Sequence, residues 1–165
     1  MKNSIKKFSI IILIFFTQGF TVGLESDSRS KKEIVVIINK AQKKEKMSIN
    51  EVRNIFLKKN TDWNPVDRKI RTDEKKDFLR VFIQMEIKKW LDYWIEQKVV
   101  EGNSPPIAYK NDYTVIKFVS AKKDGIAYLY KKNLSKGAYS KFLKNVRIVL
   151  TVKIKNEKKE KKDEK

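Results

Sequence analysis

The sequence contains no cysteine and no histidine. Without cysteine there can be no disulfide, no reactive thiolate and no lipid-modified N-terminal cysteine. Without histidine the chain lacks the commonest general base, and most zinc sites use one of these two residue types. The chain has only five glycines and shows no glycine-rich phosphate loop, no paired carboxylates suited to hydrolysis and no metal-ligand cluster. The sequence therefore predicts a protein that is not an enzyme and needs no metal or cofactor.

Basic residues are abundant. The 165 residues include 39 Lys+Arg against 20 Asp+Glu, for a formal charge of +19. The length suits one compact domain and is too short for two large ones. This charge alone would suggest a nucleic-acid partner, but the export signal described next argues against one, and we expect no nucleic acid as a partner.

The first 23 residues have the three parts of a secretory signal peptide. A cationic start, MKNSIKK, precedes the apolar run FSIIILIFF, which is shorter than the roughly 20 residues needed to span a bilayer. The small residues Thr21 and Gly23 then suit a cut after Gly23. The sequence predicts a periplasmic or secreted protein; the alternative is an uncleaved membrane anchor from Phe8 to about Val22.

The rest of the chain divides by composition. Residues 24–32 are polar and predicted to be loose, and residues 155–165 are almost wholly charged and predicted to be a disordered tail. The folded domain is predicted at 33–154.

Hydrophobic periodicity predicts an α/β domain. The segment EIVVIIN reads as a strand buried on both faces, and the last strand alternates, with Val146, Ile148, Leu150, Val152 and Ile154 facing inward. We expect one short mixed sheet flanked by about four helices. In chain order the predicted elements are a strand at 33–39, a helix from the capping box at Ser48 to Glu51, a short extended piece at 63–66, a helix from Thr72 with an apolar stripe reaching Met85, a helix from about Met85 to Gln97, a helix at 111–121 and strands at 126–130 and 146–154.

One predicted helix has an apolar face of helical spacing. It consists of Ile87, Trp90, Leu91, Trp94 and Ile95, and we expect the face to lie in the core. An alternative use of its aromatic residues, as a stacking surface for a ligand ring, is less common than a core position.

Five segments, in the same order, resemble the periplasmic phosphate-binding proteins of ABC transporters, and are most similar to their short single-lobe relatives. The resemblance spans about Glu33 to Leu129 and is carried by IVVIIN, SINEVRNIFLKKNTDWNP, PVDR, WLDYWIEQKVVEGNSPP and VSAKKDGIAYL. It implies a single periplasmic-binding-protein-like lobe and a phosphate ligand.

The resemblance also implies which residues hold the anion. The family's Arg-x-x-x-Ser-Gly-Thr places its arginine on Arg68 and its serine on Thr72, and the pattern of the short relatives adds Arg71 and Lys75. The match departs after Thr72, where Asp73-Glu74 replaces Gly-Thr. The family's first lobe, which supplies the other half of the site, has no counterpart in this sequence.

The residues around Thr72 permit two interpretations. A helix N-terminus attracts anions, and nearby arginines could grip an oxyanion there. Alternatively, Thr72 is an ordinary helix cap and the acidic residues after it complement the helix dipole. If Arg68 holds an anion, we expect Arg68→Gln to weaken binding with little change in stability; otherwise Arg68 is an exposed strand end.

Two functions remain open from the sequence. The first is an exported module that binds phosphate or a related oxyanion, with an ABC transporter or another envelope protein as partner. The second is a non-catalytic interaction protein that keeps the lobe but uses its basic surface to contact anionic envelope components such as phospholipid or lipopolysaccharide.

Overall fold

The computed structural model describes residues 32–135 and 137–154. The predicted signal peptide, nearly all of the predicted loose segment and the predicted charged tail lie outside the described residues. Within this part of the chain, no helix is long and apolar enough to cross a membrane. The division of the chain into signal peptide, loose segment, folded domain and charged tail stays a prediction.

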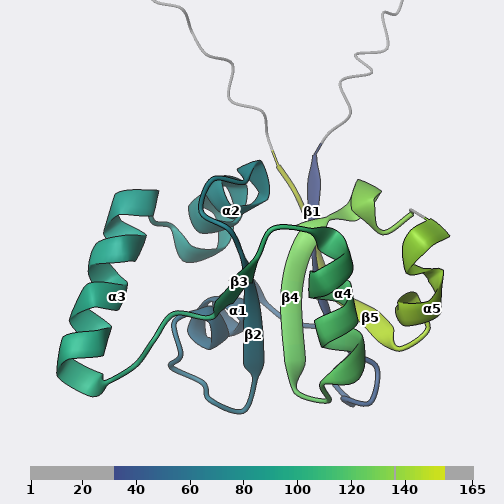
Figure 1. Ribbon diagram of the computed structural model, residues 1–165, viewed down its shortest axis with the longest axis horizontal. Coiled ribbons are helices and arrows are strands. Elements are labelled where there is room, and N and C mark those ends of the chain that lie inside the picture. The colour runs from purple at the N-terminus through teal and green to yellow at the C-terminus, as the bar shows by residue number, and fades with distance from the viewer. Residues whose placement is uncertain (1–31, 136, 155–165) are drawn as a thin grey trace, which may run out of the picture.

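The centre of the fold is one mixed sheet of five strands in the order β3-β2-β4-β1-β5 (Figure 1). Strand β2 is parallel to β3 and to β4, whereas β1 is antiparallel to β4 and to β5. The strands are β1 (Glu33–Asn39), β2 (Asn64–Arg68), β3 (Ile107–Tyr109), β4 (Gly125–Tyr130) and β5 (Val146–Lys153).

Helices cover both faces of this sheet. Alternate residues of β1 explain why: Ile34, Val36 and Ile38 pack in one apolar cluster, and Val35 and Ile37 pack in the other. The first cluster lies under α1 (Ile49–Phe56), α2 (Asp73–Phe78) and α3 (Ile87–Glu101), and the second under α4 (Asp112–Ala121) and α5 (Ser140–Leu143). The predicted α/β class and the mixed sheet are confirmed.

The predicted capping box at the start of α1 is present. The hydroxyl of Ser48 accepts a hydrogen bond from the Glu51 amide, and the Glu51 carboxylate accepts from the Ser48 amide at 2.8 Å. The amine of Lys44, 2.6 Å away, and these contacts with Ser48 lower the pKa of Glu51 from 4.5 to about 2.

This shift predicts a small acid-sensitive contribution to stability. Because the folded-state pKa of Glu51 lies below the unfolded value, its stabilisation is complete above pH 4.5 and is lost as the pH falls toward 2. We expect Glu51→Gln to lower the free energy of unfolding by a few tenths to about 1 kcal/mol at neutral pH, since the pair is exposed and screened. Urea denaturation at neutral pH and near pH 2 measures this difference in the free energy of unfolding between Glu51→Gln and the unmodified protein. An equal deficit at both pH values, or the same profile in Glu45→Gln outside the capping box, would contradict the assignment.

Several predicted boundaries are wrong. Strand β3 and helix α5 were not predicted, because three or four residues are too few to show a period. The helix expected from Thr72 to Met85 is shorter: α2 ends at Phe78, and a π-helical turn follows at Leu79–Ile83. Gln84 then adopts a left-handed conformation (φ 61°), which ends the turn before α3 begins.

The last strand does not alternate as predicted. Its register against β1 shifts between Val36 and Ile37, where Leu150 and Ile148 are their respective partners. Val149 is therefore the extra residue of a bulge, and it is buried, whereas Ile148 is 41% exposed. A bulge reverses which side chains face inward beyond it, and period-two counting from the sequence cannot detect it.

Helix α3 buries only part of its predicted apolar face. Trp90 and Trp94 lie in the core as expected, at 3% and 5% exposure. Leu91 and Ile95, predicted to lie beside them, are 48% and 65% exposed. Its tryptophans join the core cluster that also holds residues of α1 and α2, and the helix lies at the edge of the domain (Figure 1). The neighbouring aliphatic residues therefore have nothing to pack against in the described part of the chain.

Candidate anion-binding site

The predicted site residues lie where the parallel strands end. The carboxyl ends of β2, β3 and β4 point in the same direction, and helices α2 and α4 begin beside them. In open α/β sheets ligands bind outside this edge. The predicted site residues therefore lie at the edge of the sheet where such ligands bind. They form two groups: Arg68 and Lys75 are buried, whereas Arg71 and Thr72 line a solvent-open pocket.

Arg68 belongs to the buried group and is not the exposed strand end considered above. Its side chain is 4% exposed. The Nη2 group lies 3.0 Å from Oε2 of Glu74 and 3.1 Å from Oδ1 of Asp112, and Asn133 donates to the other oxygen of Glu74 at 2.9 Å. The carboxylates that hold Arg68 thus come from the chain itself.

Lys75 is buried next to it and is 1% exposed. Its amine donates to Oδ2 of Asp67 and lies 3.7 Å from the ring centroid of Trp90. The other oxygen of Asp67 accepts from the Tyr128 hydroxyl and from the amide of Arg68. Asp67 is next to Arg68 in the chain, but its ion pair is with Lys75.

Burial controls the protonation of these groups. It lowers the pKa of Lys75, although the neighbouring charge of Asp67 opposes the shift. Burial raises the pKa of Tyr128 well above its ordinary value, and the charge of Asp67 adds to this rise. Tyr128 therefore remains a neutral hydrogen-bond donor to Asp67.

The buried cluster has an excess of negative charge. Among the described residues it contains three carboxylates (Asp67, Glu74, Asp112) and two cations (Arg68, Lys75), for a formal charge of −1. An entering oxyanion would face these carboxylates in a low-dielectric interior, where repulsion is strong. The Nε and Nη1 groups of Arg68 have no hydrogen-bond partner among the described residues, but they are buried with the rest of the side chain.

Thr72 has the geometry of a helix cap. Its hydroxyl donates to the Lys69 carbonyl at 2.9 Å and accepts from the Lys75 amide at 3.2 Å. Both hydrogen-bonding functions are thus used inside the chain. An anion could approach Thr72 only by displacing one of these contacts.

The second group lies outside the cluster, at a solvent-open pocket. The pocket has a volume of about 350 Å³ and is lined by Lys69, Ile70, Arg71, Thr72 and Lys110. Its three basic side chains are exposed, and no carboxylate in the described part of the chain forms a salt bridge with them. Lys69 and Lys110 were not among the predicted site residues, because the pairing of β2 with β3 brings them to the same edge.

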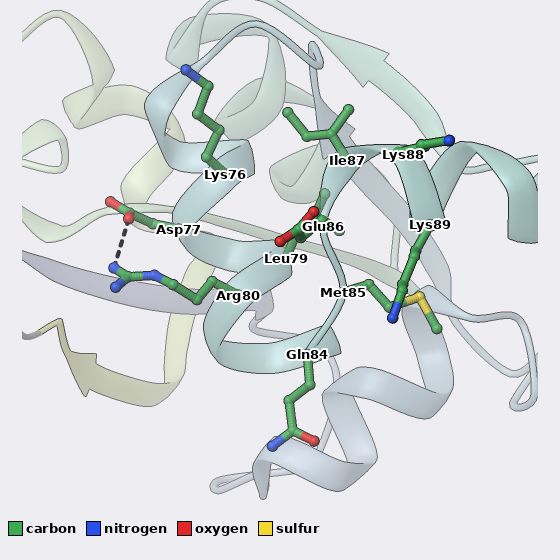
Figure 2. A pocket seen from close by; sticks show the side chains of 10 residues that line it. All are labelled: Lys76, Asp77, Leu79, Arg80, Gln84, Met85, Glu86, Ile87, Lys88 and Lys89. Atoms are coloured by element: carbon green, nitrogen blue, oxygen red, sulfur yellow. Dashed lines mark hydrogen bonds and ion pairs between the residues drawn. The ribbon is translucent and has the colours of Figure 1, made fainter. Parts of the chain in front are cut away.

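A larger pocket of about 900 Å³ lies between α2, the π-helical turn and the start of α3. Figure 2 shows the amines of Lys76, Lys88 and Lys89 pointing in different directions. Asp77 and Arg80 also line the pocket and form an ion pair at 3.0 Å, so the positive charge of Arg80 is partly neutralised by Asp77. These cations do not converge on one point, so we assign no ligand to this pocket. No group of residues suited to hold a metal ion is found in the described ranges.

Comparison with known proteins identifies the fold through structure only. No protein-family model matches the sequence, and no curated protein does. Solved structures do match. One is an ABC-type phosphate transport receptor from Vibrio cholerae, with a TM-score of 0.52 and 8% identity over 72% of this chain. The described domain shares its fold with part of that protein.

A second solved structure supports this result. PstS from Borrelia burgdorferi is similar over 72% of this chain, with a TM-score of 0.51 and 14% identity. The chain spans less than half the length of both proteins, 45% and 46%. The predicted resemblance is confirmed for the fold, and at these identities the fold is what the similarity shows.

Proposed function

We propose that this protein is an exported, non-catalytic module that binds phosphate or a related oxyanion. The binding site is the solvent-open pocket lined by Lys69, Arg71, Thr72 and Lys110. The observation that carries the proposal is the contrast between the two groups of cations. Arg68 and Lys75 are neutralised by carboxylates of the same chain, whereas Lys69, Arg71 and Lys110 are exposed and available to an external anion. The fold of phosphate-transport proteins is consistent with this ligand.

The openness of the pocket predicts weak binding. Hinged binding proteins enclose their ligand between two lobes, and enclosed sites bury most of the ligand surface. Exposed cations contribute about 0.2–1 kcal/mol each, and salt reduces this further. The phosphate group could therefore belong to free phosphate or to a larger anionic molecule that adds contacts of its own.

The second candidate is an interaction protein of the cell envelope. The formal charge of +19 favours it, because such a charge attracts anionic surfaces such as phospholipid or lipopolysaccharide without a defined site. An ABC transporter or another envelope protein is a further partner consistent with the fold.

A triple variant tests the proposed pocket. Replacing Lys69, Arg71 and Lys110 with glutamine should weaken phosphate binding by about tenfold or more, the equivalent of about 1.4 kcal/mol. The matched control replaces three exposed lysines elsewhere, Lys59, Lys98 and Lys123, and removes the same charge. Isothermal titration with inorganic phosphate, alongside titration with vesicles containing an anionic phospholipid, measures both ligand sources.

The outcomes separate the candidates. Loss of binding in the pocket variant alone supports the pocket, and the titration that shows it identifies the source of the phosphate group. An equal loss in both variants, removed by moderate salt, would support the basic surface instead. If phosphate affinity is unchanged in the pocket variant but falls in folded Arg68→Gln, the anion binds at the buried cluster and not at the pocket.

A further inference from the structure

Helix α3 carries an exposed apolar stripe. Leu91, Ile95 and Val99 are spaced four residues apart, so they lie on one face of the helix. They are 48%, 65% and 81% exposed. Trp90 and Trp94, each one residue before Leu91 and Ile95, lie on the adjacent buried face and anchor the helix to the domain.

Nothing in the described part of the chain covers this stripe. Figure 1 shows α3 at one end of the molecule, with the sheet on one side of it and no labelled element beyond it. Three large aliphatic side chains in a row on an outer face are unusual for a protein surface this rich in lysine, and such contiguous patches mark interaction sites.

The charges of α3 point to the kind of partner. The chain as a whole carries +19 and repels its own copies. Residues 86–101 are different: they contain four acids (Glu86, Asp92, Glu96, Glu101) and three bases (Lys88, Lys89, Lys98), for a net charge of −1. Two copies that meet at α3 therefore bring no excess of positive charge from this helix into the contact.

The order of these charges favours an antiparallel arrangement. The first turn of α3 contains Lys88 and Lys89 and no acid, whereas Glu96 and Glu101 lie near its end with Lys98. Basic residues at a helix start and acidic ones at its end oppose the helix dipole and destabilise an isolated helix. An antiparallel neighbour places the acidic end of one helix near the basic end of the other and aligns the two dipoles favourably.

We propose that the α3 stripe is the interface of a two-fold symmetric dimer of this chain. The two helices cross antiparallel with Ile95 at the symmetry axis, so Ile95 meets Ile95 of the second copy and Leu91 meets Val99 of the second copy. A two-fold interface uses the same patch on both molecules, which a stripe centred on one residue allows. This inference does not depend on the proposed phosphate pocket.

The natural absence of cysteine makes a clean cross-linking test. Under mild oxidation, Ile95→Cys should form a disulfide-linked dimer on a non-reducing gel, because its two copies lie at the axis. The control is Lys123→Cys, which is also exposed but lies in the turn before β4 and should remain monomeric. Circular dichroism of each variant confirms that it is folded.

Mixed variants test the orientation. Leu91→Cys, carrying a size tag, should cross-link with Val99→Cys more than either variant does with itself. Cross-linking of Leu91→Cys mainly with itself would overturn the antiparallel arrangement.

Light scattering then tests the dimer without a cross-link. The unmodified protein should elute at twice the mass of one chain at micromolar concentration, and Ile95→Asp should elute as a monomer. An unmodified protein that stays monomeric while Ile95→Cys cross-links no more than Lys123→Cys would overturn the proposal. So would a monomer whose binding to anionic vesicles is lost in Ile95→Asp, since the stripe would then contact lipid.

Discussion

Replacing Arg68 with glutamine is expected to lower the free energy of unfolding by about 3–5 kcal/mol, the usual result when one partner of a buried ion pair is removed. The variant removes the guanidinium that lies 3.0 Å from the buried carboxylate of Glu74 and 3.1 Å from that of Asp112. A loss of this size is a large share of the 5–15 kcal/mol that stabilises a typical domain. Urea denaturation followed by circular dichroism measures it, and the result replaces the small stability change expected from the sequence.

Two further variants identify the cause. Arg80→Gln removes an arginine that pairs with Asp77 at the same 3.0 Å distance but is 40% exposed, so the loss should stay below about 1 kcal/mol. Adding Glu74→Gln to Arg68→Gln should recover part of the stability, because the unpaired carboxylate is removed with its partner. A double variant less stable than Arg68→Gln would show that the cluster is not stabilised by charge pairing.

The Arg68→Gln variant also tests whether Arg68 takes part in anion binding. If burial beside Glu74 and Asp112 keeps Arg68 from contacting the ligand, phosphate affinity is unchanged in Arg68→Gln, measured at a temperature where the variant remains folded. A drop in affinity without loss of stability would mean that Arg68 is available to ligand after all.

The second large effect is expected from Phe78→Ala, with a loss of about 3–5 kcal/mol, the range for deleting a buried phenyl ring. Phe78 is fully buried, and its ring lies parallel to that of Tyr128 with a centroid distance of 3.7 Å. It also stacks on Phe82 at 4.9 Å and contacts Phe56 at 4.7 Å. Removing it opens a cavity and releases Tyr128, the hydrogen-bond donor to Asp67.

Chemical denaturation again provides the measurement. Val100→Ala, in the exposed part of α3, is the control and should change stability by less than about 0.5 kcal/mol. A Phe78→Ala protein as stable as this control would contradict the packing around Tyr128.

Local patterns predicted much of the fold. The continuous apolar run of β1 predicted a strand buried on both faces, and the helix predicted at 111–121 corresponds to α4. The Ser48–Glu51 pattern predicted a helix cap that the structure contains. These features follow from short-range spacing, which the sequence displays directly.

The candidate site was predictable only in part. Thr72 was recognised as a cap and Arg68 as the end of β2, yet neither the burial of Arg68 nor its partners could be foreseen. Asp112 is 44 residues away along the chain and reaches Arg68 only because β2 and β3 pair in parallel and α4 follows β3. Contacts at such separations leave no periodic signal.

The sequence by itself determined the charge, the lack of thiol and imidazole chemistry, the α/β class and most helix starts, since each depends on composition or on residues within one or two turns. The tertiary structure decided the bulge in β5, the exposure of Leu91 and Ile95, and the division of the cations into a neutralised group and an exposed one. The physical reason is that burial and charge pairing depend on which segments meet in space, and that arrangement minimises the free energy of the whole chain rather than of any local segment.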